Sequence, residues 1–182
     1  MKKMSVMGLA AAFMLQAALL SWLVIDRALL LAHGTEIRLN VVPVDPRDLL
    51  RGDYVTLSYA VSRLWTNELD IAETFAEDDA IYVSLRQDGK DWKAVAAHRR
   101  RPADGLVLKG RVTRVTNCGD RCRIYAVDYN LEKFFVSEGQ GRDIERLTNG
   151  HVEVDVAVAA NGRAALKRLL VDGAVRYADI LF

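Results

Sequence analysis

The feature that most limits how this chain can fold is a long stretch without charge near its amino terminus. The 22 residues from Met4 to Ile25 include no Asp, Glu, Lys or Arg. As a helix they would span about 33 Å at roughly 1.5 Å per residue, and the hydrocarbon layer of a bilayer is about 30 Å thick. The sequence therefore predicts one membrane-spanning helix. Residues 1–33 form the cytoplasmic tip and anchor, residues 34–182 form one separate domain, and membrane lipid is the first expected partner.

Charges at the two ends of this stretch predict its orientation. Lys2 and Lys3 precede it, whereas Asp26 and Arg27 follow it. Because basic residues are retained on the cytoplasmic side, we expect a single-pass protein of the bacterial inner (cytoplasmic) membrane with its amino terminus inside and its carboxy-terminal domain in the periplasm. The helix is expected to run about two more turns and to end at Gly34.

Two other interpretations of the apolar stretch are weaker. A cleaved signal peptide needs a shorter apolar region and a small-x-small exit, but residues 29–34 read Leu-Leu-Leu-Ala-His-Gly. A buried helix of a soluble protein rarely continues so far without a charge. We therefore expect an uncleaved signal anchor.

Composition argues against nucleic acid as a partner. The 182 residues carry 25 basic and 24 acidic side chains, a formal net charge of +1. Without Lys2 and Lys3 the balance becomes slightly negative, so the chain has no basic excess that would attract a polyanion.

Beyond Gly34 the pattern is typical of a mainly β fold. Apolar and polar residues alternate, and tight-turn signals such as Asp88-Gly89 and Asn161-Gly162 separate short apolar runs. The expected strands are residues 36–44, 54–59, 80–86, 92–97, 106–116, 123–127, 152–159 and 164–171. Residues 63–78 are expected to be loops around a short helical piece, and residues 142–147 a short helix. This spacing predicts a compact antiparallel β barrel or sandwich.

One segment combines a turn with the start of a strand. Arg51 precedes Gly52-Asp53, where glycine tolerates a positive φ and aspartate can bond its own backbone. Residues 54–59 then alternate, with Leu57 and Tyr59 on the expected buried face. We expect one continuous strand here.

The same segment resembles the GDYXXLXY family. Gly52-Asp53-Tyr54, Leu57 and Tyr59 reproduce the pattern that names that family, and residues 42–51 resemble the part that leads into it. A second block, residues 135–141 with Ile144-Glu145, is also similar. The resemblance implies a membrane-anchored protein and brings no catalytic residues. The candidate binding residues from the two blocks are Arg51, Gly52, Asp53, Tyr54, Leu57, Tyr59, Glu138, Gly139 and Glu145.

Cys118 and Cys122 are the two cysteines of the chain. Their spacing at the tip of an expected hairpin, in an oxidising compartment, favours a disulfide over two free thiols. A redox-active pair is disfavoured because the spacing is not Cys-x-x-Cys. A metal site would need further ligands, and the three histidines are scattered, so we expect no metal.

Possible catalytic groups remain incomplete. The segment around Pro43 and Pro46 resembles the nucleophile region of type I signal peptidases, but Pro43 stands where the serine is needed. Lys109 is the candidate for the lysine base, yet it would have no serine to activate. Ser58 and Ser62 come after the proline-containing segment, where the signal-peptidase pattern has no nucleophile. A second possibility is acid–base chemistry by clustered carboxylates, whose candidates are Asp45, Asp48, Asp53, Glu138 and Glu145.

Arginine-rich and acidic runs are more simply explained as solvated surface. The sequence His98-Arg99-Arg100-Arg101 stands at an expected strand end.

With no complete catalytic set, we expect an extracytoplasmic accessory or binding module, without a cofactor, that engages an integral-membrane protein or an envelope component. The alternative is an envelope hydrolase, either a signal-peptidase-like barrel or a carboxylate-based enzyme, with its site around Asp53.

Overall fold

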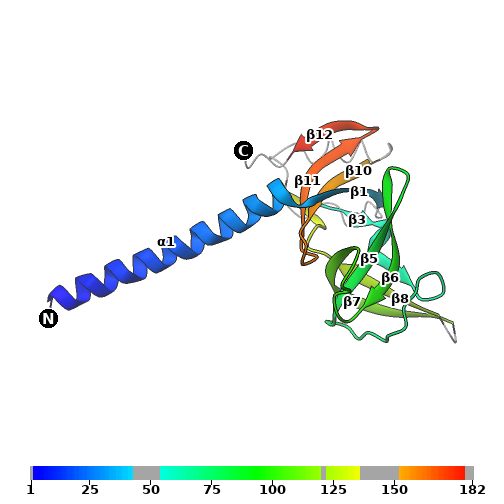
Figure 1. Ribbon diagram of the computed structural model, residues 1–182, viewed down its shortest axis with the longest axis horizontal. Coiled ribbons are helices and arrows are strands. Elements are labelled where there is room, and N and C mark those ends of the chain that lie inside the picture. Colours follow the sequence, from blue (N-terminus) through cyan, green and yellow to red (C-terminus); the bar gives the residue numbers. More distant parts are fainter. Residues whose placement is uncertain (1, 43–53, 120–121, 136–151, 179–182) are drawn as a thin grey trace.

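A computed structural model describes residues 2–42, 54–119, 122–135 and 152–178 (Figure 1). The elements, in chain order, are the helix α1 (Lys2–His33), the strands β1 (Thr35–Val42), β2 (Tyr54–Thr56) and β3 (Ser58–Tyr59), a 3₁₀ turn (Ala60–Ser62), and the strands β4 (Arg63–Trp65), β5 (Ala80–Asp88), β6 (Asp91–His98), β7 (Leu106–Gly119), β8 (Cys122–Asp128), β9 (Lys133–Phe135), β10 (Val152–Val158), β11 (Ala164–Val171) and β12 (Ala174–Ala178).

Helix α1 projects away from the β domain as a long rod (Figure 1). Its stretch Met7–His33 has a mean hydropathy of 2.0, which is apolar and long enough to cross a bilayer. Only its last turns touch the domain, where Leu30 and Leu31 pack on Ala157 of β10 and Ala165 of β11. The helix ends as expected: the N–H of Gly34 donates to the carbonyl of Leu30 at 2.9 Å, and β1 begins at the next residue.

The strands form a nearly closed, barrel-like antiparallel fold, so the mainly β prediction is confirmed. One five-stranded sheet has the order β12-β11-β10-β1-β3, a second has the order β4-β8-β7-β5-β6, and β2 pairs with β9. A single core fills the space between the sheets. Its fully buried members include Ile37 and Leu39 from β1, Ile81 from β5 and Leu169 from β11.

The expected hairpins are present with small differences. Strands β5 and β6 pair through Asp88 and Asp91, so the loop is Gly89-Lys90, one residue later than expected. Strands β7 and β8, and β10 and β11, pair antiparallel as expected. Strand β4 lies in the region expected to be loop and helix, and β12 was not expected at all. The expected helix 142–147 lies outside the described residues.

Strand β10 alternates apolar and polar residues along much of its sequence, yet its burial does not alternate. All seven of its residues are buried. The valines of β10 pack into the main core. The opposite face is covered by Leu30 and Leu31 of α1 at Ala157, and by arginine side chains at Asp155, which Arg38 and Arg168 both reach. An acidic residue on a strand can therefore mark a buried ion pair as well as a solvated face.

The prediction of one continuous strand from Tyr54 to Tyr59 was also wrong. The segment is divided at Leu57 into β2, which pairs with β9, and β3, which pairs with β1. The N–H of Leu57 donates to the carbonyl of Glu132 at 2.7 Å. The segment thus passes from one sheet to another and links them.

Candidate functional site

The structure describes some of the candidate residues named from the sequence. Tyr54 begins β2, and Leu57 and Tyr59 are buried at 4% and 1% exposure. The remaining candidates lie outside the described residues: Arg51, Gly52, Asp53, Glu138, Gly139 and Glu145, with Asp45 and Asp48. Leu57 and Tyr59 therefore have a packing role, since both belong to the core.

Two buried tyrosines join the motif segment to the loop that follows β8. The hydroxyl of Tyr59 donates to the carbonyl of Leu131 at 2.6 Å, and the hydroxyl of Tyr129 donates to the carbonyl of Val61 at 2.7 Å. Burial raises the pKa of both phenols well above its ordinary value, so both remain donors. We call these two reciprocal hydrogen bonds the tyrosine clasp.

The loop held by the clasp is internally ordered by carboxylates. Asn130 adopts a φ of 60°, and its N–H donates to the Asp128 carboxylate at 2.7 Å. The carboxyl of Glu132 accepts from the N–H of Tyr129 and from its neighbour Leu131, each at 2.8 Å. Side-chain bonds to nearby backbone groups of this kind stabilise tight turns. The position of this loop is therefore fixed both by its own carboxylates and by the clasp.

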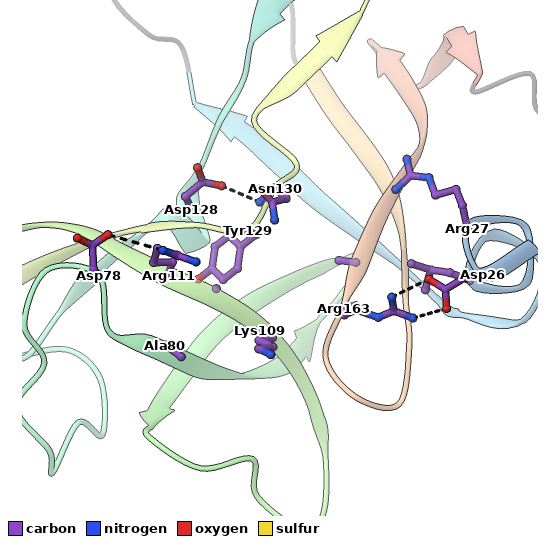
Figure 2. A pocket seen from close by; sticks show the side chains of 13 residues that line it. Asp26, Arg27, Asp78, Ala80, Lys109, Arg111, Asp128, Tyr129, Asn130 and Arg163 are labelled. Carbon is purple, nitrogen blue, oxygen red and sulfur yellow. Dashed lines mark hydrogen bonds and ion pairs between the residues drawn. The ribbon is translucent and has the colours of Figure 1, made fainter. Parts of the chain in front are cut away.

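Beside this loop lies a cleft of about 740 Å³ at the base of helix α1 (Figure 2). The helix contributes Asp26, Arg27 and Leu30. The segment before β5, with strands β5 and β7, contributes Asp78, Ala80, Lys109, Gly110 and Arg111. The end of β8, the loop after it and the β10–β11 hairpin contribute Asp128, Tyr129, Asn130, Arg163 and Ala164. Clefts of this size are typical of ligand sites. We call it the anchor cleft.

Ion pairs occupy both ends of the anchor cleft. The guanidinium of Arg163 donates two hydrogen bonds of 2.7 Å to the carboxylate of Asp26. At the other end Arg111 and Asp78 are 3.8 Å apart and largely exposed. Figure 2 shows Lys109 between these pairs. Its amino group lies 6.0 Å from the ring centre of Tyr82 and makes no ion pair with a described residue.

Backbone contacts fix the floor of the cleft. The N–H of Lys109 donates to the carbonyl of Gly162 at 2.8 Å. A Cβ atom on Gly110 would lie 2.4 Å from Cγ1 of Val127 and 2.9 Å from the carbonyl oxygen of Asp128. Only glycine allows β7 to approach the end of β8 this closely. The cleft therefore has a rigid base although its charged side chains reach solvent.

Glu132 is a largely buried carboxyl group in this loop, and its pKa lies near neutral pH. Burial, and then a hydrogen bond with the Asp128 carboxyl, raise the pKa of Glu132 to about 7. Sequence reasoning missed this group because its burial, the largest cause of the shift, comes from the fold, although its hydrogen-bond partners are close in the sequence. The pair lies next to the anchor cleft, which Asp128 lines, and can hold one proton between two carboxyls.

This shift predicts a pH-dependent stability. Below about pH 4.5, its ordinary value, Glu132 is protonated in the folded and unfolded chains alike. Between that pH and about 7 only the folded chain keeps the proton, so stability is lost as pH rises through this window. After allowance for solvent screening we expect a loss on the order of 1–2 kcal/mol.

The measurement is the melting temperature of the wild type and of Glu132→Gln between pH 4.5 and 8. The wild type should lose stability with rising pH, and the variant, which does not titrate, should lose less. Parallel curves for the two proteins would show that Glu132 ionises normally.

Other sequence candidates are clear in the structure. Cys118 and Cys122 lie at disulfide-bonding distance, with Cα atoms 5.0 Å apart, at the end of the β7–β8 hairpin. Arg99 pairs with Glu73 and Asp79, as expected for a surface strand end. Lys109 forms no hydrogen bond with a serine in the described part of the chain. Among those residues no group of three or more His, Cys, Asp or Glu is placed to hold a metal.

Comparisons with known proteins give one match. The family model described as GDYXXLXY protein matches residues 16–169, which covers the last part of the helix span and most of the β domain. No curated protein and no solved structure matches the chain.

Proposed function

The chain belongs to the GDYXXLXY protein family, and we propose that it acts as a membrane-anchored extracytoplasmic binding module without catalytic activity. Its partner would be an integral-membrane protein or an envelope component next to the membrane. The observation that carries the proposal is the rigid junction between helix α1 and the β domain. A module of this kind holds a binding surface at a fixed height above the bilayer.

Helix α1 and the β domain are in close contact at their junction. A Cβ on Gly34 would lie 2.6 Å from the Leu30 carbonyl oxygen and 3.0 Å from the Ala157 Cβ, so helix and sheet touch at the turn. The Asp26–Arg163 pair adds two hydrogen bonds across the same contact. An enzyme that acts on diffusing substrates has no need of such a fixed height, whereas a module that engages a neighbour in the membrane does.

Two observations support an extracytoplasmic domain. Lys2 and Lys3 precede the apolar span, which favours an amino terminus inside. The bonding distance between Cys118 and Cys122 fits an oxidising compartment.

The alternative is an envelope hydrolase with its site around Asp53. One structural observation favours it: Glu132 and Asp128 form a carboxyl pair with a pKa of about 7 for Glu132, and paired carboxyls with separated pKa values can perform acid–base catalysis. Backbone N–H groups already occupy both oxygens of Glu132, which suits a loop-holding role better.

The test combines topology with partner capture. A reporter active only in the cytoplasm, fused after Phe182, should be silent, and a reporter active only in the periplasm should work. Affinity capture of the intact protein from detergent-solubilised membranes should return one membrane or envelope protein at a constant ratio. As a control, Asp53→Asn should still complement a deletion strain.

Two outcomes would contradict the module. A cytoplasmic reporter that is active after Phe182 would reverse the topology. An Asp53→Asn variant with normal abundance and melting temperature, but without complementation, would favour the hydrolase.

A further inference from the structure

We propose that the anchor cleft binds the headgroup of an anionic phospholipid from the membrane leaflet at the outer end of helix α1. The proposal deepens the proposed function, because it rests on α1 spanning the membrane and names a ligand for the surface at its end. The ligand chemistry is a phosphodiester with net negative charge on a glycerol backbone.

The position of the cleft along the helix is the first argument. The uncharged stretch ends at Ile25, and the next two residues, Asp26 and Arg27, line the cleft. A stretch of 22 residues is about 33 Å long as a helix, so charge returns where the hydrocarbon ends and the headgroups begin. Since α1 is held firmly on β10 and β11, the cleft is fixed at headgroup height.

The charge balance of the cleft is the second argument. Four basic side chains and three carboxylates line it. Asp26 is engaged by both nitrogens of Arg163, and Asp128 accepts from Asn130 and bonds Glu132. Lys109 has no carboxylate partner among the described residues, and Arg111 has only an exposed one at 3.8 Å. The available charge in the middle of the cleft is therefore positive.

The shape and mixed lining of the cleft are the third argument. Its volume of about 740 Å³ suits a headgroup with part of the glycerol. Leu30, Tyr129 and Ala164 supply apolar contact beside the cations, which a free anion would not need. Lysine and arginine side chains at the end of a membrane span attract anionic headgroups. Because the remaining chain has no basic excess, the attraction is local to this cleft.

The experiment uses the full-length protein in micelles of a neutral detergent. Phosphatidylglycerol is added, and lipid bound per protein is measured by native mass spectrometry, beside the melting temperature. We compare the wild type with the double variant Lys109→Gln/Arg111→Gln. A matched control is Lys90→Gln, since Lys90 is exposed in the β5–β6 loop and does not line the cleft.

The expected result is saturable binding of phosphatidylglycerol with a raised melting temperature for the wild type and Lys90→Gln. The double variant should bind on the order of tenfold or more weakly, with an unchanged melting temperature in detergent alone. Zwitterionic phosphatidylcholine should bind weakly to all three proteins.

Two results would overturn the proposal. Equal binding by the wild type and the double variant would show that the cleft is not the lipid site. Stabilisation by inorganic phosphate alone, equal to that by the lipid and lost in the double variant, would make the cleft a site for a soluble anion. Binding in micelles does not depend on which side of the membrane the domain faces, so a failed topology reporter would remove the proposed function and leave this result standing.

Discussion

Replacing Asp155 with alanine is expected to lower the free energy of unfolding by about 2–4 kcal/mol. Asp155 is 2% exposed in the middle of β10. Its carboxylate accepts hydrogen bonds from Arg38 Nε at 2.8 Å and from Arg168 Nε at 3.0 Å. Removing it leaves two guanidinium groups facing each other without the charge that they share. Their partial exposure, 29% and 36%, lets water compensate in part.

This ion triad also matches the strand register. Arg38 stands opposite Asp155, and Asp155 stands opposite Arg168 on the three neighbouring strands β1, β10 and β11. A shift of one residue would turn each side chain to the other face, which would place the carboxylate in the apolar core. We therefore expect Asp155→Asn, which keeps the size and one acceptor, to cost about half as much as alanine.

The measurement is urea unfolding of the full-length protein in neutral detergent, followed by tryptophan fluorescence. Glu36→Gln is the control: Glu36 pairs with Lys167 and Arg168 but is exposed, so we expect an effect below about 1 kcal/mol. A double-mutant cycle with Arg38→Ala should give a coupling energy above about 1 kcal/mol. If the losses of stability in the two single variants simply added in the double variant, Asp155 and Arg38 would contribute to stability independently.

Local patterns in the sequence predicted the parts of the fold that depend on neighbouring residues. The long apolar helix follows from length without charge, and the β5–β6 and β10–β11 hairpins follow from Asp88-Gly89 and Asn161-Gly162. The division of the motif segment at Leu57 could not be predicted, because it depends on pairing with the carbonyl of Glu132, 75 residues away. Strand β12 follows a turn in which Asp172 and Gly173 both have positive φ, and no strand was expected after residue 171.

The anchor cleft was beyond sequence reasoning for the same physical reason. Lys109 drew notice as a possible catalytic base, yet its surroundings come from Asp26, Asp128 and Arg163, which belong to three distant segments. Nothing in the local sequence indicates that they meet. The motif residues Leu57 and Tyr59 were candidates for binding, and in the structure both side chains pack in the core.

The tyrosine clasp gives the second large effect. Tyr59→Ala should lower the free energy of unfolding by about 3–5 kcal/mol, because it removes a buried ring from the core and leaves a cavity. Tyr59→Phe keeps the ring and removes only the donor to the Leu131 carbonyl, so about 1–2 kcal/mol is expected. Tyr129→Phe should cost a similar amount through the Val61 carbonyl.

The variants Tyr59→Phe and Tyr129→Phe test whether the motif segment serves folding or partner binding. If the clasp holds the 128–132 loop against the motif segment, the double variant should unfold more easily than either single variant, and binding should decline only as folded protein is lost. Tyr82→Phe is the matched control, because Tyr82 is half-buried on β5 and its hydroxyl makes no hydrogen bond with a described residue; it should change stability by less than about 0.5 kcal/mol. Urea unfolding and partner capture on the same samples provide both readings. A Tyr59→Phe protein that is as stable as the wild type but captures no partner would show that the motif hydroxyl serves recognition, and that the clasp is a by-product of its position.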